Sequence, residues 1–66
     1  MKIYIVHIDA LNEEQNFNDL SNDEIEKMYK GGNLYVACYS SVEALCNEWN
    51  NDWVFNPEFS FMRVID

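Results

Sequence analysis

Residues 2–9, KIYIVHID, form the segment that most narrows the choice of fold. In an extended chain, successive side chains point to opposite sides, and here both sides are largely apolar. One side holds Ile3, Ile5 and His7, and the other holds Tyr4, Val6 and Ile8. A strand that is apolar on both sides is typical of the inside of a sheet that is covered on each face. The segment therefore predicts an inner strand.

The chain length allows one domain, residues 1–66, with a single small core. Hydrophobic residues make up 48% of the chain and aromatic residues 15%, which is too apolar for a disordered protein. Aromatic side chains bury much area from few positions. We expect Trp49 and Phe59 to belong to the core, whereas Trp53 and Phe55 fit a core and an exposed interface about equally well.

A first helix is predicted over residues 22–30. Ser21 is a good N-cap and Glu24 completes a capping box, and the apolar residues Leu20 and Ile25 fit the hydrophobic staple around that cap. Two glycines end the helix, because glycine adopts the left-handed conformation without a Cβ penalty. The predicted buried stripe is Ile25, Met28 and Tyr29, and the predicted i, i+4 ion pairs are Asp23–Lys27 and Glu26–Lys30.

The start of this helix imitates a calcium-binding loop, because Asp19, Ser21 and Asp23 stand at alternate positions. The sixth position of such a loop needs glycine and is Glu24, and the twelfth needs glutamate and is Lys30. The pattern therefore favours a capped helix over a metal site. An incidental weak cation site in the preceding loop stays open, with the ligands Asp9, Glu13, Glu14 and Asp19.

The rest of the chain is predicted to add one helix and two strands. Residues 34–39, LYVACY, are typical of a strand, and in an alternative reading only residues 34–36 pair. Ser40 and Glu43 form a capping box for a second helix, and residues 59–65 form the last strand after a turn at 56–58. The apolar stripe of the second helix is Val42, Leu45, Cys46 and Trp49.

The segment between the first strand and the first helix is predicted to be a loop, with a helical turn at 10–15 and with Phe17 as its apolar anchor. The predicted fold class is therefore α+β. It comprises a small single-layer three-stranded sheet with two short helices, in the order β-α-β-α-β.

The residues that carry chemistry are few. His7 is the only histidine and lies in an apolar strand, where a hydrogen-bonded structural role is the more common one. Cys38 and Cys46 lack the spacing of a zinc site, and we expect both to be small apolar residues on buried faces. No glycine-rich phosphate loop precedes a helix. The sequence therefore predicts no enzyme, no cofactor and no dedicated metal site.

The excess of acidic residues limits the kinds of molecule that the chain can bind. Twelve acidic residues against four basic ones give a net charge of −8, which disfavours direct binding to nucleic acid or to an anionic membrane. The acids concentrate in the 9–19 loop and around the second helix. The most plausible partner surface lies in the second half of the chain and comprises Glu43, Glu48, Asp52, Trp53, Phe55 and Glu58. A basic protein is the expected partner, and a second copy of the chain is the alternative.

We expect a non-enzymatic acidic protein-binding module. The alternatives are a nucleic-acid mimic that inhibits a host defence or DNA-binding protein, a weak metal-responsive domain, and an acidic face that serves solubility only. The first apolar run meets Asp9 at once and has no small-residue cleavage site, and two cysteines are too few for a disulfide framework. These features favour the cytoplasm.

The string LSNDEIEKMY … GNLY … SVEALCNEWN … FSFMRVI resembles small acidic proteins of gut bacteria and their phages. The shared features are a capped acidic helix, a short strand, a second helix that ends in asparagine and a C-terminal strand. They map to Ser21 and Glu24, to residues 32–35, to Asn50 and to residues 61–65, while VACY at 36–39 resembles an insertion. The resemblance implies no activity, and it favours a small accessory protein of a mobile element.

Overall fold

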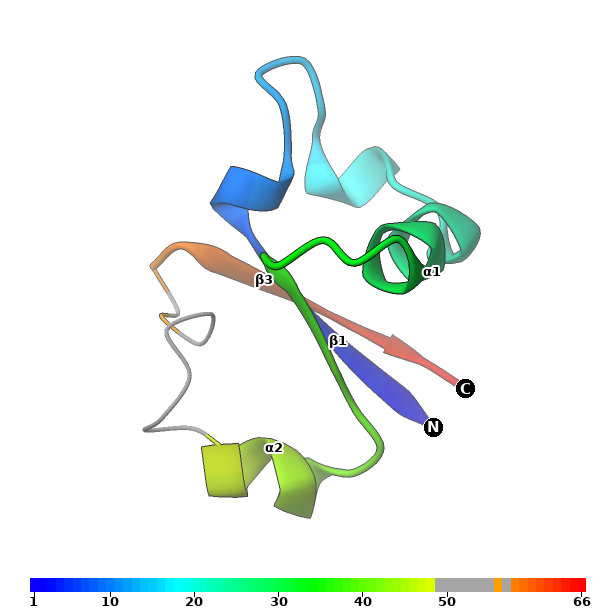
Figure 1. Cartoon of the computed structure of the whole chain (residues 1–66), viewed down its shortest axis with the longest axis vertical. Coiled ribbons are helices and arrows are strands. Elements are labelled where there is room, and N and C mark those ends of the chain that lie inside the picture. Colours follow the sequence, from blue (N-terminus) through cyan, green and yellow to red (C-terminus); the bar gives the residue numbers. More distant parts are fainter. Residues whose placement is uncertain (49–55, 57) are drawn as a thin grey trace.

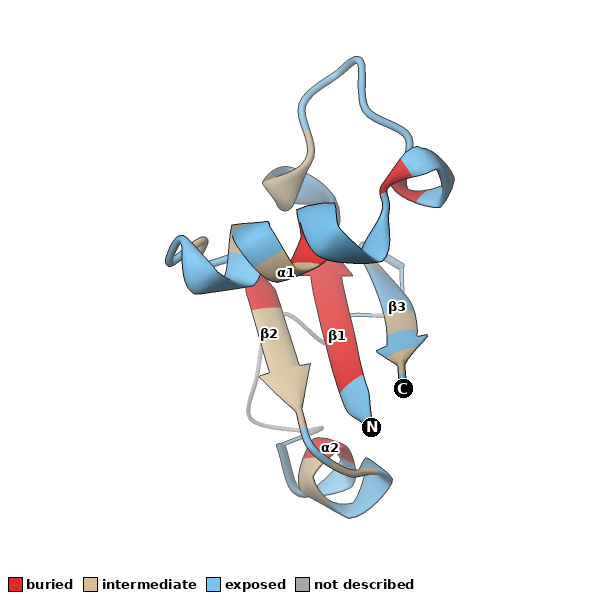
Figure 2. Cartoon of the chain, turned by 90° about the vertical axis from the view of Figure 1, so that its right-hand side faces the viewer, coloured by how far each residue is buried: buried red, intermediate tan, exposed pale blue. Residues whose placement is uncertain are grey.

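The computed structural model describes all residues except 49–55 and 57. Three antiparallel strands form one sheet: β1 (Lys2–His7) lies between β2 (Val36–Tyr39) and β3 (Ser60–Ile65). Two α-helices, α1 (Asn22–Lys30) and α2 (Val42–Glu48), complete the order β-α-β-α-β. The predicted α+β fold is thus confirmed (Figure 1), with β1 as the central strand (Figure 2).

The alternation along β1 divides the core into two clusters on opposite faces of the sheet. Tyr4 and Val6 pack with Phe17, Leu20, Ile25 and Val36, on the face that α1 crosses (Figure 2). Ile3 and Ile5 pack with Leu45 of α2 on the other face. These four of the six residues of β1 are buried, as a strand covered on both faces requires.

The start of α1 agrees with the sequence pattern. The backbone N–H of Glu24 donates to Ser21 Oγ at 3.1 Å, and the backbone N–H of Ser21 donates to Glu24 Oε1 at 3.3 Å, so the capping box is complete. Leu20 and Ile25 are both buried in the same cluster. The helix ends before Gly32, whose φ of 82° is the left-handed conformation that glycine permits.

The predicted ion pairs along α1 are wrong. Within the described residues, Glu26 Oε1 lies 3.6 Å from Lys2 Nζ of β1, and neither i, i+4 pair forms. Tyr29 is exposed, although its ring makes an edge contact with the buried Tyr4 at 5.8 Å between centroids. Contact with a neighbouring strand thus replaces pairing within the helix.

Between β1 and α1 the chain makes two short 3₁₀ turns, at Ile8–Ala10 and Phe17–Asp19. The helical turn predicted at 10–15 is therefore misplaced, and Ile8 leaves the strand and is exposed. Phe17 is buried, as predicted for the anchor of this loop.

Strand β2 begins later than the sequence indicates. Asn33 holds a turn, because its side-chain oxygen accepts from the backbone N–H of Tyr35 at 2.9 Å and its carbonyl accepts from that of Val36 at 3.2 Å. Pairing with β1 then runs from Val36 to Tyr39. The alternative in which only residues 34–36 pair is wrong.

Helix α2 is capped by Ser41, one residue after the predicted cap. The backbone N–H of Ala44 donates to Ser41 Oγ at 3.1 Å, so the predicted capping box of Ser40 and Glu43 does not form. Leu45 is the buried residue of the helix, while Val42 and Cys46 are exposed. The predicted stripe is wrong at these two positions, and Trp49 lies outside the described residues.

Arg63 of β3 connects the loop before α1 to the sheet by hydrogen bonds. Its guanidinium donates to the carbonyl of Leu20 at 3.1 Å, to Asn22 Oδ1 at 2.9 Å and to the carbonyl of Phe17 at 3.3 Å. It also lies 4.9 Å from the centre of the Phe17 ring. A single side chain thereby joins β3, the second 3₁₀ turn and the start of α1.

Candidate functional site

The structure describes three of the six residues of the predicted partner surface. Glu43 and Glu48 are exposed on α2, and Glu58 is exposed just before β3. Asp52, Trp53 and Phe55 lie outside the described residues. Phe59, which the sequence placed in the core, is exposed.

The other acidic segment lies at the opposite end of the molecule. In Figure 1 the loop that contains residues 11–16 is at the top and α2 is at the bottom. Asp9, Glu13, Glu14 and Asp19 are exposed, and among the described residues no lysine or arginine pairs with them. The acids of the 9–19 loop and those of α2 therefore lie on two separate surfaces.

The acids of the 9–19 loop do not assemble the incidental cation site. Across residues 1–48, 56 and 58–66, no group of three or more histidine, cysteine, aspartate or glutamate side chains could hold a metal ion. Asn12 and Asn16 hold the turns of this loop, because their side-chain oxygens accept from backbone N–H groups two residues further on.

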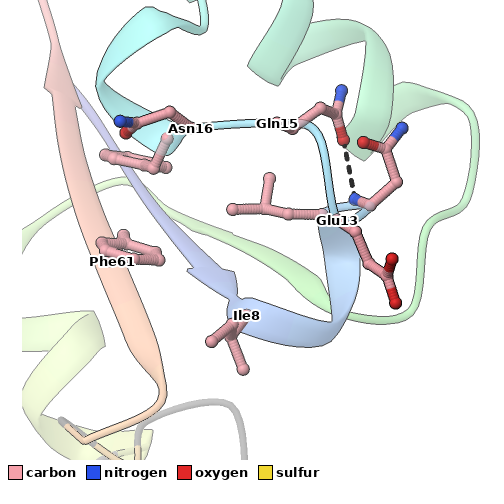
Figure 3. Close-up of a pocket in the computed structure, with 8 residues that line it drawn as sticks. Ile8, Glu13, Gln15, Asn16 and Phe61 are labelled. Atoms are coloured by element: carbon pink, nitrogen blue, oxygen red, sulfur yellow. Dashed lines mark hydrogen bonds between the residues drawn. The ribbon is translucent and has the colours of Figure 1, made fainter.

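A pocket of about 460 Å³ lies between this loop and β3 (Figure 3). The rings of Phe17 and Phe61 stack in its wall, with centroids 4.7 Å apart and planes 9° apart. The other apolar residues of the lining are Ile8 and Leu11, and the polar ones are Asn12, Glu13, Gln15 and Asn16.

The amide side chains of the pocket use their oxygens to hold the loop. Gln15 Oε1 accepts from the backbone N–H of Asn12 at 3.0 Å. Asn12 Oδ1 and Asn16 Oδ1 each accept from the backbone N–H two residues further on, at 3.1 and 3.0 Å. Their NH₂ groups are then the donors of the rim, and the carboxylate of Glu13 is an acceptor beside them. Apolar side chains with a few polar groups are the usual lining of ligand pockets in proteins.

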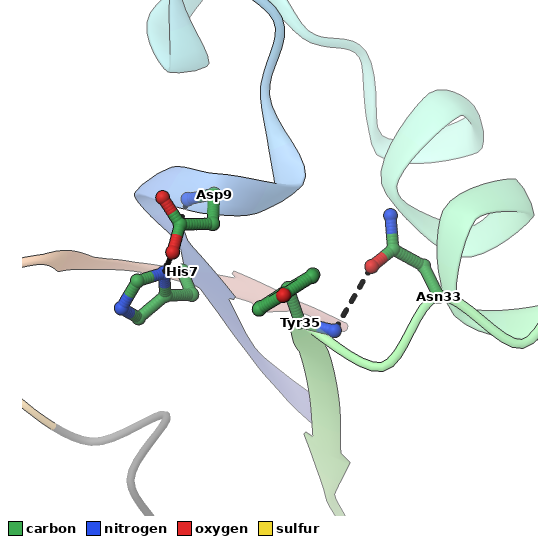
Figure 4. A network of polar contacts seen from close by, with 4 residues as sticks. All are labelled: His7, Asp9, Asn33 and Tyr35. Atoms are coloured by element: carbon green, nitrogen blue, oxygen red, sulfur yellow. Dashed lines mark hydrogen bonds and ion pairs between the residues drawn. The ribbon is translucent and has the colours of Figure 1, made fainter.

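His7 has a structural role at the end of β1 (Figure 4). Its Nδ1 accepts from the backbone N–H of Asp9 at 3.0 Å, and the Asp9 carboxylate oxygen Oδ2 lies 3.5 Å from the same atom. The ring also lies near those of Tyr35 and Phe59, with centroids 5.9 and 6.4 Å away. Nδ1 is thus engaged in capping the first 3₁₀ turn.

The two cysteines are free and differ in surroundings. Cys38 is half-buried beside Tyr4, whereas Cys46 is exposed on α2, so the expectation of a buried face is wrong for Cys46. Burial, followed by a hydrogen bond with the Cys38 side chain, raises the pKa of Tyr4 from 10.0 to about 12.

The Tyr4 phenol gives a prediction for alkaline pH. A folded-state pKa above the unfolded value means that the neutral phenol stabilises the fold below pH 10, and that this contribution is lost as the pH rises toward 12. We expect the free energy of unfolding to fall more steeply in this range for the native chain than for Tyr4→Phe. Urea unfolding at several pH values measures the free energy of unfolding of the native chain and of Tyr4→Phe. If the two free energies changed with pH in parallel, the raised pKa of Tyr4 would be contradicted.

The last strand was predicted, but its position at the open edge of the sheet is the feature that sequence reasoning missed. Its outer edge pairs with no described residue, and Met62 and Val64 are 59% and 48% exposed on the α2 side of the sheet. Its only charged side chain, Arg63, is turned inward. The available signal was the run FSFMRVI, which is apolar on both sides like β1 but lies at the edge of the sheet.

Comparison of the chain with protein-family models, with curated proteins and with solved structures gave no match. Within the described part of the chain, no helix has the length and apolar character needed to cross a membrane.

Proposed function

We propose that this chain is a small protein-binding module without chemistry of its own, which docks on a basic partner protein. The observation that carries the proposal is the acidic surface. The described acids of the 9–19 loop, of α2 and at Glu58 are exposed, and they form no ion pair with a described lysine or arginine. Apart from Asp9, whose Oδ2 lies 3.5 Å from His7 Nδ1, these carboxylates have no charged partner among the described residues, so they are available to steer and orient a partner.

Two further observations support this assignment. The exposed apolar side chains of β3 and the pocket beside Phe61 supply contact area next to the charges. The free thiols of Cys38 and Cys46 suit a reducing compartment such as the cytoplasm. The resemblance to small acidic proteins of gut bacteria and phages supports an accessory role.

The test begins with capture on the immobilised full chain from an extract of the native cell, followed by mass spectrometry. The captured protein is then purified and titrated against the chain by calorimetry at low and high salt. We expect a basic partner whose affinity falls about tenfold or more as salt screens the charges. The absence of a stoichiometric partner, or binding that salt does not alter, would reject the proposal.

Two matched triple variants locate the docking charges. Glu43→Lys/Glu48→Lys/Glu58→Lys alters the described part of the predicted partner surface, and Glu13→Lys/Glu14→Lys/Asp19→Lys alters the loop by the same number of charges. We expect the first variant to weaken binding at least about tenfold and the second to weaken it far less. If the partner is a DNA-binding protein that releases its DNA on binding, the function is inhibition by nucleic-acid mimicry.

A further inference from the structure

We infer that the outer edge of β3 is a strand-addition site, which takes an extended segment of the partner, apolar in its middle and basic at both ends. The inference rests on the proposed function, because it names the surface and the segment by which the binding module would dock.

At Met62 and Val64, the backbone of β3 presents hydrogen-bonding groups that no described residue pairs with. The backbone N–H of Ile8 donates to the carbonyl of Phe59 at 2.7 Å, which fixes the phase of the ladder between β1 and β3. Backbone groups alternate in direction along an antiparallel strand. The N–H and C=O groups of Met62 and Val64 therefore point to the open edge, where no described residue pairs with them. An added strand satisfies such a row of alternating donors and acceptors.

The side chains of β3 define the middle of the added segment. Met62 and Val64 are exposed on the α2 side of the sheet, and Phe61 is 40% exposed on the α1 side, stacked on Phe17. Neighbouring strands place side chains of the same face about 5 Å apart. Apolar residues on both sides of an added strand would thus meet apolar neighbours.

The charges of β3 define the ends of the added segment. Glu58 precedes the strand and Asp66 follows it, and both are exposed. Arg63, the strand's basic residue, is held by Phe17, Leu20 and Asn22 and does not offset them. Lysine or arginine at each end of the incoming segment complements these acids, whereas a second copy would bring the same acids and a further net charge of −8.

The other sheet edge is less suitable. Strand β2 has four residues against six for β3, and its side chains are buried or half-buried. The backbone N–H of Val36 is also engaged with the carbonyl of Asn33. The open edge of the sheet is therefore β3.

The test selects binders from a random library of displayed peptides about twelve residues long, which is enough to span one strand. The immobilised full chain is the target. We expect enriched peptides with an apolar centre and basic ends, and amide hydrogen exchange by NMR that slows at Met62 and Val64 when a selected peptide is added. No enrichment, or slower exchange at other sites only, overturns the inference. So does protection that rises with concentration of the chain alone, which shows that β3 pairs with a second copy.

Two variants of Met62 separate edge pairing from a merely apolar contact. Met62→Pro removes an N–H that points away from β1, so the β1–β3 ladder is kept while peptide binding is lost. Met62→Lys keeps the N–H but sets a charge against the apolar middle of the segment. It is expected to weaken binding about tenfold or more, which provides a second readout if the proline variant does not fold. Met62→Leu is the matched control and should bind like the native chain. If a captured cellular partner binds all three variants equally, strand addition at β3 is wrong while the binding module stands.

Discussion

Replacing Arg63 by alanine is expected to lower the free energy of unfolding by about 1.5–3 kcal/mol, the range for a hydrogen bond to a charged group. The substitution removes the donors to the carbonyls of Phe17 and Leu20 and to Asn22 Oδ1, and it also removes the cation from the Phe17 ring. The acceptors at Phe17 and Leu20 lie in a partly buried setting, which increases the cost of leaving them without a donor.

Arg63→Lys is the matched control for charge. Lysine keeps the positive charge but has a single nitrogen, which cannot reach three acceptors with the geometry of the guanidinium fork. We expect it to recover less than half of the lost stability. Urea unfolding gives the free energies, and amide exchange should show that residues 17–22 loosen first. A loss below about 0.5 kcal/mol for Arg63→Ala, as for an ordinary surface residue, would contradict this role.

The parts of the fold that the sequence predicts well depend on short-range physics. The bounds of α1 follow from Ser21, Glu24 and the glycines, which lie within or next to the helix itself. The central position of β1 follows from its apolar residues on both sides, since only a covered strand can bury Ile3 and Tyr4 together. Such local and one-strand signals need no knowledge of the neighbours.

The features that the sequence does not predict correctly are of two kinds. In some, two neighbouring residues or two local conformations are almost equally favourable, and in others the structure depends on contacts between distant segments. Ser40 and Ser41 are both competent caps, and the packing of Leu45 on β1 accompanies the use of Ser41. Similarly, Asn33 can form a turn or precede a longer strand. The role of Arg63 joins residues more than 40 positions apart, so no sequence window contains it.

Of the candidate partner surface, only the exposed acidic side chains could be predicted from the sequence. Exposure of Glu43, Glu48 and Glu58 follows from their polarity, because an unpaired carboxylate is costly to bury. The open edge of β3 was not predictable, because strand order decides which of two apolar strands is central. The pairing of β1 with both other strands leaves β3 at the outside.

Replacing Leu45 by alanine is expected to cost about 2–4 kcal/mol, the range for a buried leucine truncated to alanine. Leu45 is 7% exposed and is the residue by which α2 joins the cluster of Ile3 and Ile5. A helix of seven residues is not stable alone in water, so its docking depends on such contacts. Loss of this side chain should release α2 while the cluster around Tyr4 and Ile25 stays packed.

Val42→Ala provides the matched control on the same helix. Val42 is 57% exposed, and its truncation should change the free energy of unfolding by less than about 0.5 kcal/mol. In the stripe predicted from the sequence both residues face the core, and both substitutions would then be costly. Urea unfolding together with amide exchange in α2 and α1 distinguishes the two orientations. If the two variants lost the same free energy of unfolding, α2 would present a different face to the sheet. If amide exchange in α2 becomes faster with Leu45→Ala alone, the orientation with Leu45 toward the sheet is established.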